Sequence, residues 1–311
     1  MKKTLLTAII LLTAVMAQAQ NSVKINPVLK VGMQKTYTTR GEATTPGTAA
    51  ADVSGEVSYK VAAKTTDGYQ IDIVTTVSKI DATQMIQNMN AADIMQLLNS
   101  MNVELLTDKK GALTGIKNSK ELIDQCNIMI DSLFNSVINQ SAELKDNKEF
   151  KANIQKGASV MKDMITENYL METFTQTPSI TMLNGKTITE GMQEDGMFSF
   201  FKTKTTYSIL NSGKTIVQDT KADIDMQSMK AYLLKIMDSM MPESVAKETN
   251  PEQLSGMIEN MISNGTLKMD MNRKTTYDIG DDGWVKKLVM QMDMNIPGQS
   301  SKVRQVITLK D

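Results

Sequence analysis

The chain has 311 residues and is nearly neutral, with 34 basic and 35 acidic residues and a formal net charge of −1. This balance gives no electrostatic reason to expect nucleic acid or an anionic membrane surface as a partner. The sequence has no histidine and a single cysteine, Cys126. It therefore excludes Ser-His and Cys-His catalytic arrangements and an intramolecular disulfide, and we expect Cys126 to be a buried, inert thiol on a helix.

Residues 1–19 are typical of a secretory signal peptide. Lys2 and Lys3 precede an apolar stretch, Leu5 to Met16, that is too short to span a bilayer, and Ala17-Gln18-Ala19 supplies a small-x-small cleavage signal. We therefore predict an exported protein, periplasmic or extracellular, whose mature part, 20–311, is a single domain. No later apolar run is long enough for a transmembrane helix, so the mature chain is not expected to span a membrane.

The mature chain begins with runs of two-residue alternation, which is the period of a β-strand. Val53 to Ala63 and Tyr69 to Ile80 flank Asp67-Gly68, and an Asp-Gly pair supplies the positive φ that a hairpin turn needs. A tyrosine, a short alternating run and a glycine turn recur at Tyr207 and Tyr277. The sequence therefore predicts one extended antiparallel meander.

Helical periodicity interrupts this meander at about 81–168 and again at about 225–264. In the first interruption, Asp81 and Asn118 are typical helix caps, and a third helix is expected from 147 to 168. A short hairpin at 103–116 lies between the first two helices. The stretch Tyr169 to Met197 is expected to be irregular.

The second interruption contains two expected helices. Asp225 is the predicted cap of a helix from Met226 to Met241, and Asn250-Pro251 opens another that ends at Gly265. Each of these helices has an apolar stripe that needs a surface to cover. We therefore expect the helices to pack on the concave side of a curved antiparallel sheet, in a half-barrel of the α+β class.

The stretch 265–296 is the hairpin with the strongest alternation, and its apolar side is mostly methionine. The chain has 26 methionines in all. If this face encloses a ligand, we expect its wall to consist of Leu267, Met269, Met271, Leu288, Met290, Met292 and Met294.

Several of these patterns together resemble a known architecture. The signal peptide, the early hairpin at Asp67-Gly68-Tyr69, the central helical segment, Pro178 followed by Asn184-Gly185-Lys186, and Tyr277-Asp278-Ile279 before Gly283-Trp284 resemble an uncharacterised family of exported Bacteroidota proteins. The order of elements is also similar to the lipoprotein-carrier superfamily, the LolA-like half-barrels. This resemblance implies a sheet curled around an apolar cavity that is closed by helices, and a carrier or sensor of hydrophobic ligands.

Three explanations of the methionine excess remain open. Methionine fills irregular gaps in a core, it lines adaptable binding surfaces, and its thioether is a soft ligand for Cu(I). The favoured hypothesis is a non-enzymatic exported protein that binds a lipid or acyl chain between sheet and helices, with helix 226–241 as part of a lid. The alternatives are a methionine-rich Cu(I)-binding protein and a structural or partner-binding envelope protein. We expect no catalytic residues, no resident metal and no cofactor.

The remaining polar motifs are interpreted as structural. Asp281-Asp282-Gly283 is typical of an acidic hairpin turn and lacks the ligand positions of a calcium loop. Glu190, Glu194 and Asp195 are expected to be solvated in a loop. Trp284, which opens a strand, is expected to anchor a sheet edge.

Overall fold

The computed structural model describes residues 22–47, 50–81, 91–139, 148–198, 201–225, 227–231, 234, 255–256, 259–260, 270–296 and 299–310. The expected signal peptide lies outside these residues, as do Leu267, Met269 and most of the two helices expected within 225–264. Within the described ranges, no helix combines the length and the apolar character that crossing a membrane requires.

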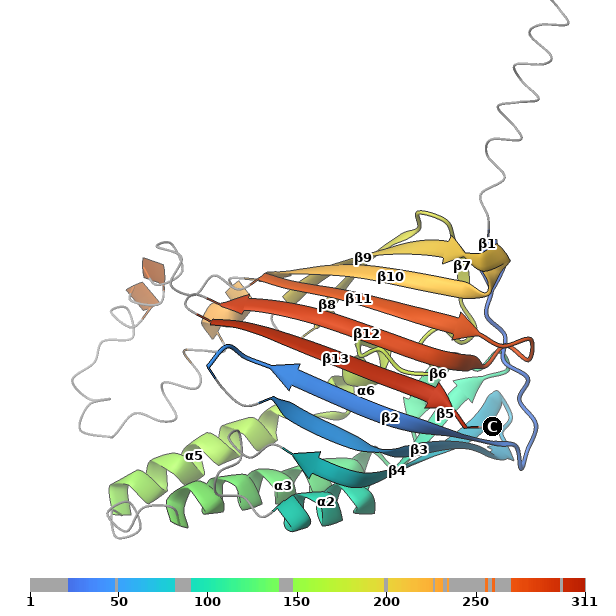
Figure 1. Cartoon of the computed structure of the whole chain (residues 1–311). Helices are drawn as coiled ribbons and strands as arrows, with labels where there is room; N and C mark the ends of the chain where they lie inside the picture. Colours follow the sequence, from blue (N-terminus) through green and yellow to red (C-terminus); the bar gives the residue numbers. More distant parts are fainter. Residues whose placement is uncertain are drawn as a thin grey trace, which may run out of the picture.

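A single large antiparallel sheet dominates the fold, and the predicted α+β class is confirmed (Figure 1). In the described part of the chain this sheet has eleven strands, in the spatial order β6-β5-β4-β3-β2-β13-β12-β11-β10-β9-β8. The bounds are β2 Gln34–Thr44, β3 Ala51–Lys64, β4 Gly68–Asp81, β5 Asn102–Asp108, β6 Leu113–Ile116, β8 Gln193–Phe198, β9 Phe201–Leu210, β10 Thr215–Ile224, β11 Asp270–Ile279, β12 Val285–Ile296 and β13 Gln299–Leu309. The short strands β1 (Ser22–Lys24) and β7 (Thr187–Thr189) pair with each other outside this sheet.

The hairpins predicted from alternation are present. β3 pairs with β4, β9 with β10 across the 3-10 turn η1 (Asn211–Gly213), and β11 with β12. Gly213 and Gly283 in these turns have positive φ, as expected. The expectation was wrong for Gly68, whose φ is not positive. A Cβ at Gly68 would lie 1.9 Å from the carbonyl oxygen of Thr107, so glycine is required there because β5 passes close to it.

Four longer helices flank the sheet in the described residues. They are α2 (Ala91–Ser100), α3 (Ser119–Asn139), α5 (Lys148–Met164) and α6 (Glu167–Gln176). The single helix expected at 147–168 is therefore two helices, and the expectation of irregular chain from Tyr169 was wrong for α6. Thr166 separates them, because its hydroxyl oxygen caps α6 by accepting from the Tyr169 N–H at 3.2 Å.

The side chain of Asn118 does not cap α3 as the sequence predicted. Its Oδ1 accepts from the backbone N–H of Glu104 at 2.9 Å, and its Nδ2 donates to the carbonyl of Asn102 at 2.7 Å. Asn118 thus ties the start of α3 to β5. Asp81, the other predicted cap, is the last residue of β4, and residues 82–90 lie outside the described part.

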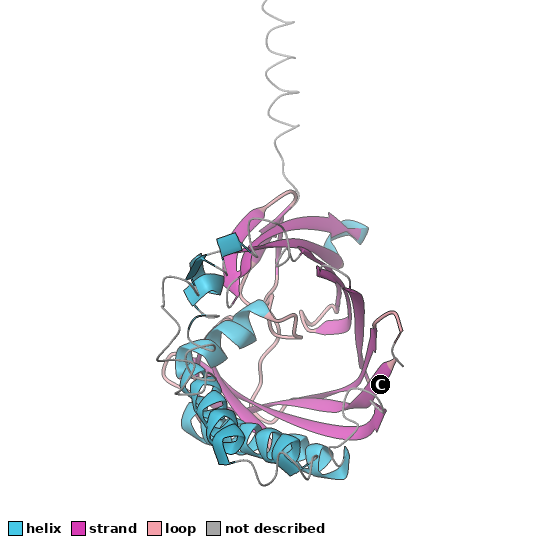
Figure 2. Ribbon diagram, turned by 90° about the vertical axis from the view of Figure 1, so that its left-hand side faces the viewer, coloured by secondary structure: helices cyan, strands magenta, loops and turns pink. Residues whose placement is uncertain are grey.

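The strands curl so that the two edges of the sheet approach each other, and α6 lies against both edge strands, β6 and β8 (Figure 2). Leu170 of α6 is buried, and Met171 and Phe174 pack against the main core. At the other edge, a Cβ on Gly196 of β8 would lie 3.0 Å from Oε1 of Gln176. This helix therefore fills the opening between the edges.

One end of the curled sheet is filled by an apolar plug. Ile25, Ile180, Leu183, Ile188 and Trp284 are each at most 1% exposed. The indole N–H of Trp284 donates to the carbonyl of Val28 at 2.9 Å, and burying a ring of this size contributes about 5 kcal/mol of hydrophobic stabilisation. The sheet-edge role expected for Trp284 was wrong, since the side chain lies in the core and β12, which it precedes, lies between β11 and β13. We call this end the plugged end and the opposite end, where β10 finishes and β11 begins, the distal end.

Alternation gives the sheet an inner face that is largely apolar and an outer face that is charged. On β10, Ile216, Gln218 and Ala222 are buried, whereas Asp219 and Lys221 are exposed. The same separation holds on β12, where the methionines are partly buried and the acidic and amide side chains between them are exposed. The inner face is therefore where apolar surface is concentrated.

Candidate binding site on the inner face of the sheet

The predicted methionine wall divides into two parts. Leu288 is fully buried in the main core, and Met290 packs against that core. Met271 belongs instead to a separate buried cluster nearer the distal end, against which Met292 packs. This cluster, here called the methionine cluster, consists of Phe201, Ala222, Ile224, Met271 and Met292.

The β11–β12 register fixes which side chains meet on this wall. Met271 lies directly opposite Met294, which is partly buried, whereas Met290 and Met292 lie opposite Thr275 and Arg273. The strands therefore bring only two of the four described methionines into direct cross-strand pairing. An arginine next to Met292 also disfavours a bound metal cation at the middle of the row.

A polar band lines the side of the main core that lies toward the methionine cluster. It includes Tyr207 on β9 and Tyr277 on β11, which belong to the main core, and Gln218 on β10, each at most 1% exposed. The amide Nε2 of Gln218 donates to the Tyr207 hydroxyl at 3.1 Å, and the Tyr277 hydroxyl donates to Oε1 of Gln218 at 3.0 Å. Burial raises the pKa of both tyrosines far above the ordinary value, so both rings stay neutral and act as hydrogen-bonding groups.

Glu194 belongs to this band, and the expectation of a loop was wrong for it, although its side chain is partly exposed. It lies on β8, accepts from the Tyr207 hydroxyl at 2.5 Å and forms an ion pair with Lys186 at 2.9 Å. Glu190 also forms a hydrogen bond within the fold, since its Oε2 accepts from the backbone N–H of Ile209 at 2.6 Å. The charge of Glu194 is therefore matched by Lys186.

Arg273 is the cation of the band for which the described part of the chain supplies no counter-charge. Its side chain continues the inward alternation of Met271 on β11, and in the described residues no ion pair or hydrogen bond forms to it. Its Nε is buried without a partner, and so is the hydroxyl of Thr275, which is 0% exposed. Desolvation lowers the pKa of Arg273, while Tyr277 and Tyr207 oppose that shift.

The sequence reasoning did not identify Arg273, Thr275, Gln218 or Glu194 as site residues. Two signals were present. Arg273 and Thr275 extend the same two-residue alternation as Met271, and the recurring tyrosines at 207 and 277 mark the same inner level. The predicted wall includes only the apolar residues of this alternation.

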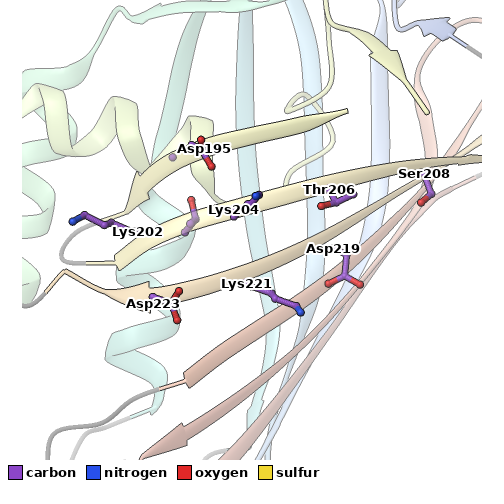
Figure 3. Close-up of a pocket in the computed structure, with 10 residues that line it drawn as sticks. Asp195, Lys202, Lys204, Thr206, Ser208, Asp219, Lys221 and Asp223 are labelled. Carbon is purple, nitrogen blue, oxygen red and sulfur yellow. The ribbon is translucent and has the colours of Figure 1, made fainter. Parts of the chain in front are cut away.

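The outer face carries a separate hollow of about 740 Å³ on β8, β9 and β10 (Figure 3). None of the predicted wall residues lines it. Its charged side chains are three aspartates and three lysines, so it has no net charge that would attract one kind of ion. They are Asp195, Lys202, Lys204, Asp219, Lys221 and Asp223.

Other candidate groups have structural surroundings. Cys126 on α3 is partly buried, and burial raises the pKa of its thiol, which keeps it neutral. Asp282 in the hairpin turn forms an ion pair with Lys35 at 2.7 Å. Across the described ranges, no group of three or more His, Cys, Asp or Glu side chains is arranged to hold a metal ion.

Comparisons with known proteins add little to this description. No protein-family model and no curated protein matches the chain. Four solved chains match, and one of them is from a structure of lipid-protein interactions in lipovitellin, with a TM-score of 0.40 and 9% sequence identity. The match covers 91% of this chain and 26% of the lipovitellin chain, so this chain spans about a quarter of that protein.

A similarity of this size carries no information about the ligand or activity of this chain. The large antiparallel sheet expected from the LolA-like resemblance is present. The closer relationship to LolA-like carriers stays a prediction.

Proposed function

We propose that this chain is a non-enzymatic binding protein for a hydrophobic ligand, a lipid or an acyl chain, held against the methionine cluster at the distal end of the sheet. The observation that carries the proposal is that this cluster is separate from the main core. Small satellite clusters beside a main core are common in proteins, and here the satellite contains methionines and lies next to polar side chains that include Arg273 and Thr275.

The two ends of the molecule support the same function. The plugged end is filled by side chains that are almost completely buried, so a ligand has no place there. At the distal end the wall contains Met271 and Met292, whose unbranched side chains repack around ligands of different shape. A hydrophobic ligand therefore enters from the distal end.

The first turn of the helix expected from Met226 begins beside the methionine cluster. Asp225 follows Ile224 and accepts from the backbone N–H of Ser228 at 3.3 Å, so the predicted cap is confirmed. Met229 on this turn is buried, and Lys230 forms an ion pair with Glu259. We assign this turn to a lid over the ligand, as in the half-barrel carriers that the sequence resembles.

Export by the predicted signal peptide fits a carrier of lipids or acylated proteins in the periplasm or outside the cell. The Cu(I) hypothesis is less well supported, because Arg273 faces the methionine row. A structural or partner-binding envelope protein remains the competing class, and it requires no ligand at all.

Binding of the neutral fluorescent probe N-phenylnaphthylamine to the purified mature protein tests the proposal. We expect Met292→Gln to weaken probe binding about ten-fold, because a polar amide replaces apolar contact surface worth ~1.4 kcal/mol. Met197→Gln, on the exposed outer side of β8, is the matched control and should leave binding unchanged. Lipid mass spectrometry of natively purified protein provides a second readout. Absence of probe binding together with absence of any co-purified hydrophobe would overturn the proposal.

A further inference from the structure

Among the described residues, the inner face of the sheet carries one positive charge without a counter-charge. On β10, β11 and β12 every inward-facing position is apolar or uncharged except Arg273, because the aspartates of these strands alternate to the outer face. Its cross-strand neighbours are Thr220 and Met292. Lys186 and Glu194 cancel each other across the band, which leaves the charge of Arg273 unmatched.

Arg273 is partly buried, and a buried guanidinium nitrogen without a hydrogen-bond partner is costly, so proteins pair such groups when the charge serves only the fold. Arg273 keeps its charge at any physiological pH, so the cost is not relieved by loss of a proton. Because the Nε is buried without a partner and none of the described residues supplies a counter-charge, Arg273 is available to pair with an anion that a ligand brings.

The surroundings of Arg273 are suited to an anionic group. Thr275, two residues further on β11 and about 7 Å away along the strand, has a buried hydroxyl without a partner. A carboxylate or phosphate has enough acceptor oxygens to take hydrogen bonds from a guanidinium and a hydroxyl together. Met292 lies directly opposite Arg273 and Met271 lies on its distal side, and both provide apolar surface.

We propose that the ligand is an anionic amphiphile, with its carboxylate or phosphate held by Arg273 and Thr275 and its hydrocarbon chain lying on the methionine cluster. This inference rests on the proposed function and adds the chemical class of the ligand. The head group lies toward the polar band and the chain extends toward the distal end. Recognition is by charge and hydrogen bonding at one end and by apolar contact along the rest.

Displacement of N-phenylnaphthylamine by three compounds of equal chain length tests the inference: dodecanoic acid, dodecanol and dodecyl phosphate. We expect the wild type to bind at least one of the two anionic compounds ten-fold or more tightly than the alcohol. A preference for dodecanoic acid would identify the ligand as a fatty acid. A preference for dodecyl phosphate would identify it as a phosphate-bearing lipid. In Arg273→Gln this preference should fall to less than three-fold, with affinity for dodecanol unchanged.

Arg304→Gln is the matched control, since Arg304 is exposed on the outer side of β13 and should leave the preference intact. Unfolding of ligand-free Arg273→Met gives a second measurement that does not depend on binding. Removing a partly buried charge that has no described partner should raise the midpoint temperature of the variant, whereas removing an arginine that the fold needs would lower it. Dodecanoic acid or dodecyl phosphate should raise the midpoint of the wild type by more than that of the variant.

The two proposals fail in different ways. Equal binding of anions and alcohol by the wild type, or an anion preference that survives Arg273→Gln, overturns the anionic head group and leaves a hydrophobic-ligand protein. Loss of all binding by the neutral probe and the three compounds overturns the proposed function itself.

Discussion

The side-chain amide of Asn99 on α2 bonds both backbone groups of Val77 on β4. Its Oδ1 accepts from the Val77 N–H at 2.5 Å and its Nδ2 donates to the Val77 carbonyl at 3.3 Å. β5 pairs with β4 only from Gly68 to Val74, so among the described strands Val77 has no neighbour on this side. One amide therefore takes the place of a strand and ties α2 to the sheet edge.

Asn99→Ala should destabilise the fold by about 1–2 kcal/mol, because it leaves an N–H and a carbonyl of β4 without partners. The urea midpoint of unfolding measures this change. Asn168→Ala, at an exposed position of α6, is the control and should change stability by less than about 0.5 kcal/mol. Equal midpoints for the two variants would contradict the role of Asn99.

Gly68→Ala should cost ~3 kcal/mol, because the added Cβ would lie 1.9 Å from the Thr107 carbonyl oxygen and force β5 away from β4. The same substitution at Gly41 on β2 meets no atom within 4 Å and should stabilise the protein by about 0.5–1 kcal/mol. Thermal unfolding followed by circular dichroism distinguishes the two variants. A tolerated alanine at Gly68 would show that β5 does not approach so closely.

Four buried tyrosines should remain neutral at alkaline pH for as long as the protein is folded. Burial raises the pKa of Tyr37, Tyr59, Tyr207 and Tyr277 above the ordinary value of 10.0. Their folded pKa exceeds the unfolded one, so the stability they contribute is fully present below pH 10 and is lost as the pH rises through the folded values.

Phenolate absorbance, titrated in parallel with circular dichroism, measures this behaviour. The absorbance of these four rings should rise only with unfolding, and Tyr277→Phe should remove one late-titrating group. Ionisation of all seven tyrosines of the chain near pH 10 with the sheet intact would contradict the burial of these four rings.

Asp225 should contribute to stability only above the acidic range. The Lys202 ammonium, at 2.6 Å, and then Ser228 hold the pKa of this carboxyl below its ordinary value of 3.8. A depressed folded pKa gives stability that is present above the unfolded value and is lost as the pH falls through the folded one. Asp225→Asn should therefore be less stable than the wild type at neutral pH, and the difference should shrink below pH 3.8.

Unfolding midpoints from neutral pH to the acidic range measure this prediction. Asp223→Asn, two residues earlier on the exposed side of β10, controls for the loss of one negative charge. A difference between wild type and Asp225→Asn that stays constant across the acidic range would show that the ion pair with Lys202 does not stabilise the protein.

The local parts of the fold were predictable from the sequence because they depend on neighbouring residues. Two-residue alternation identified the strands around Gly68 and Gly283 and the side of β12 on which Met290 and Met292 lie. The helix cap at Asp225 followed from residue type alone. For these elements the period and the turn residues carry the information.

The parts that were missed depend on contacts between distant segments. Trp284 is buried because the segment around Val28 crosses the same end of the sheet, and no pattern near Trp284 encodes that crossing. Glu194 looked solvated because β8 is a short polar strand, and its partners Lys186 and Tyr207 meet it only after the sheet curls. The α6 helix was missed although Thr166 is a good cap, because its apolar stripe is short.

The pairing of β2 with β13 has a consequence for how the protein reaches its native state. Thr38 and Thr308 are 270 positions apart, yet they meet at the seam that joins the two half-sheets. Contacts of such long range form slowly, so each half is expected to assemble first and to expose an unpaired edge meanwhile. The seam also gives two molecules a route to exchange halves with identical pairings. Refolding at rising protein concentration, followed by size-exclusion chromatography, should reveal such a dimer.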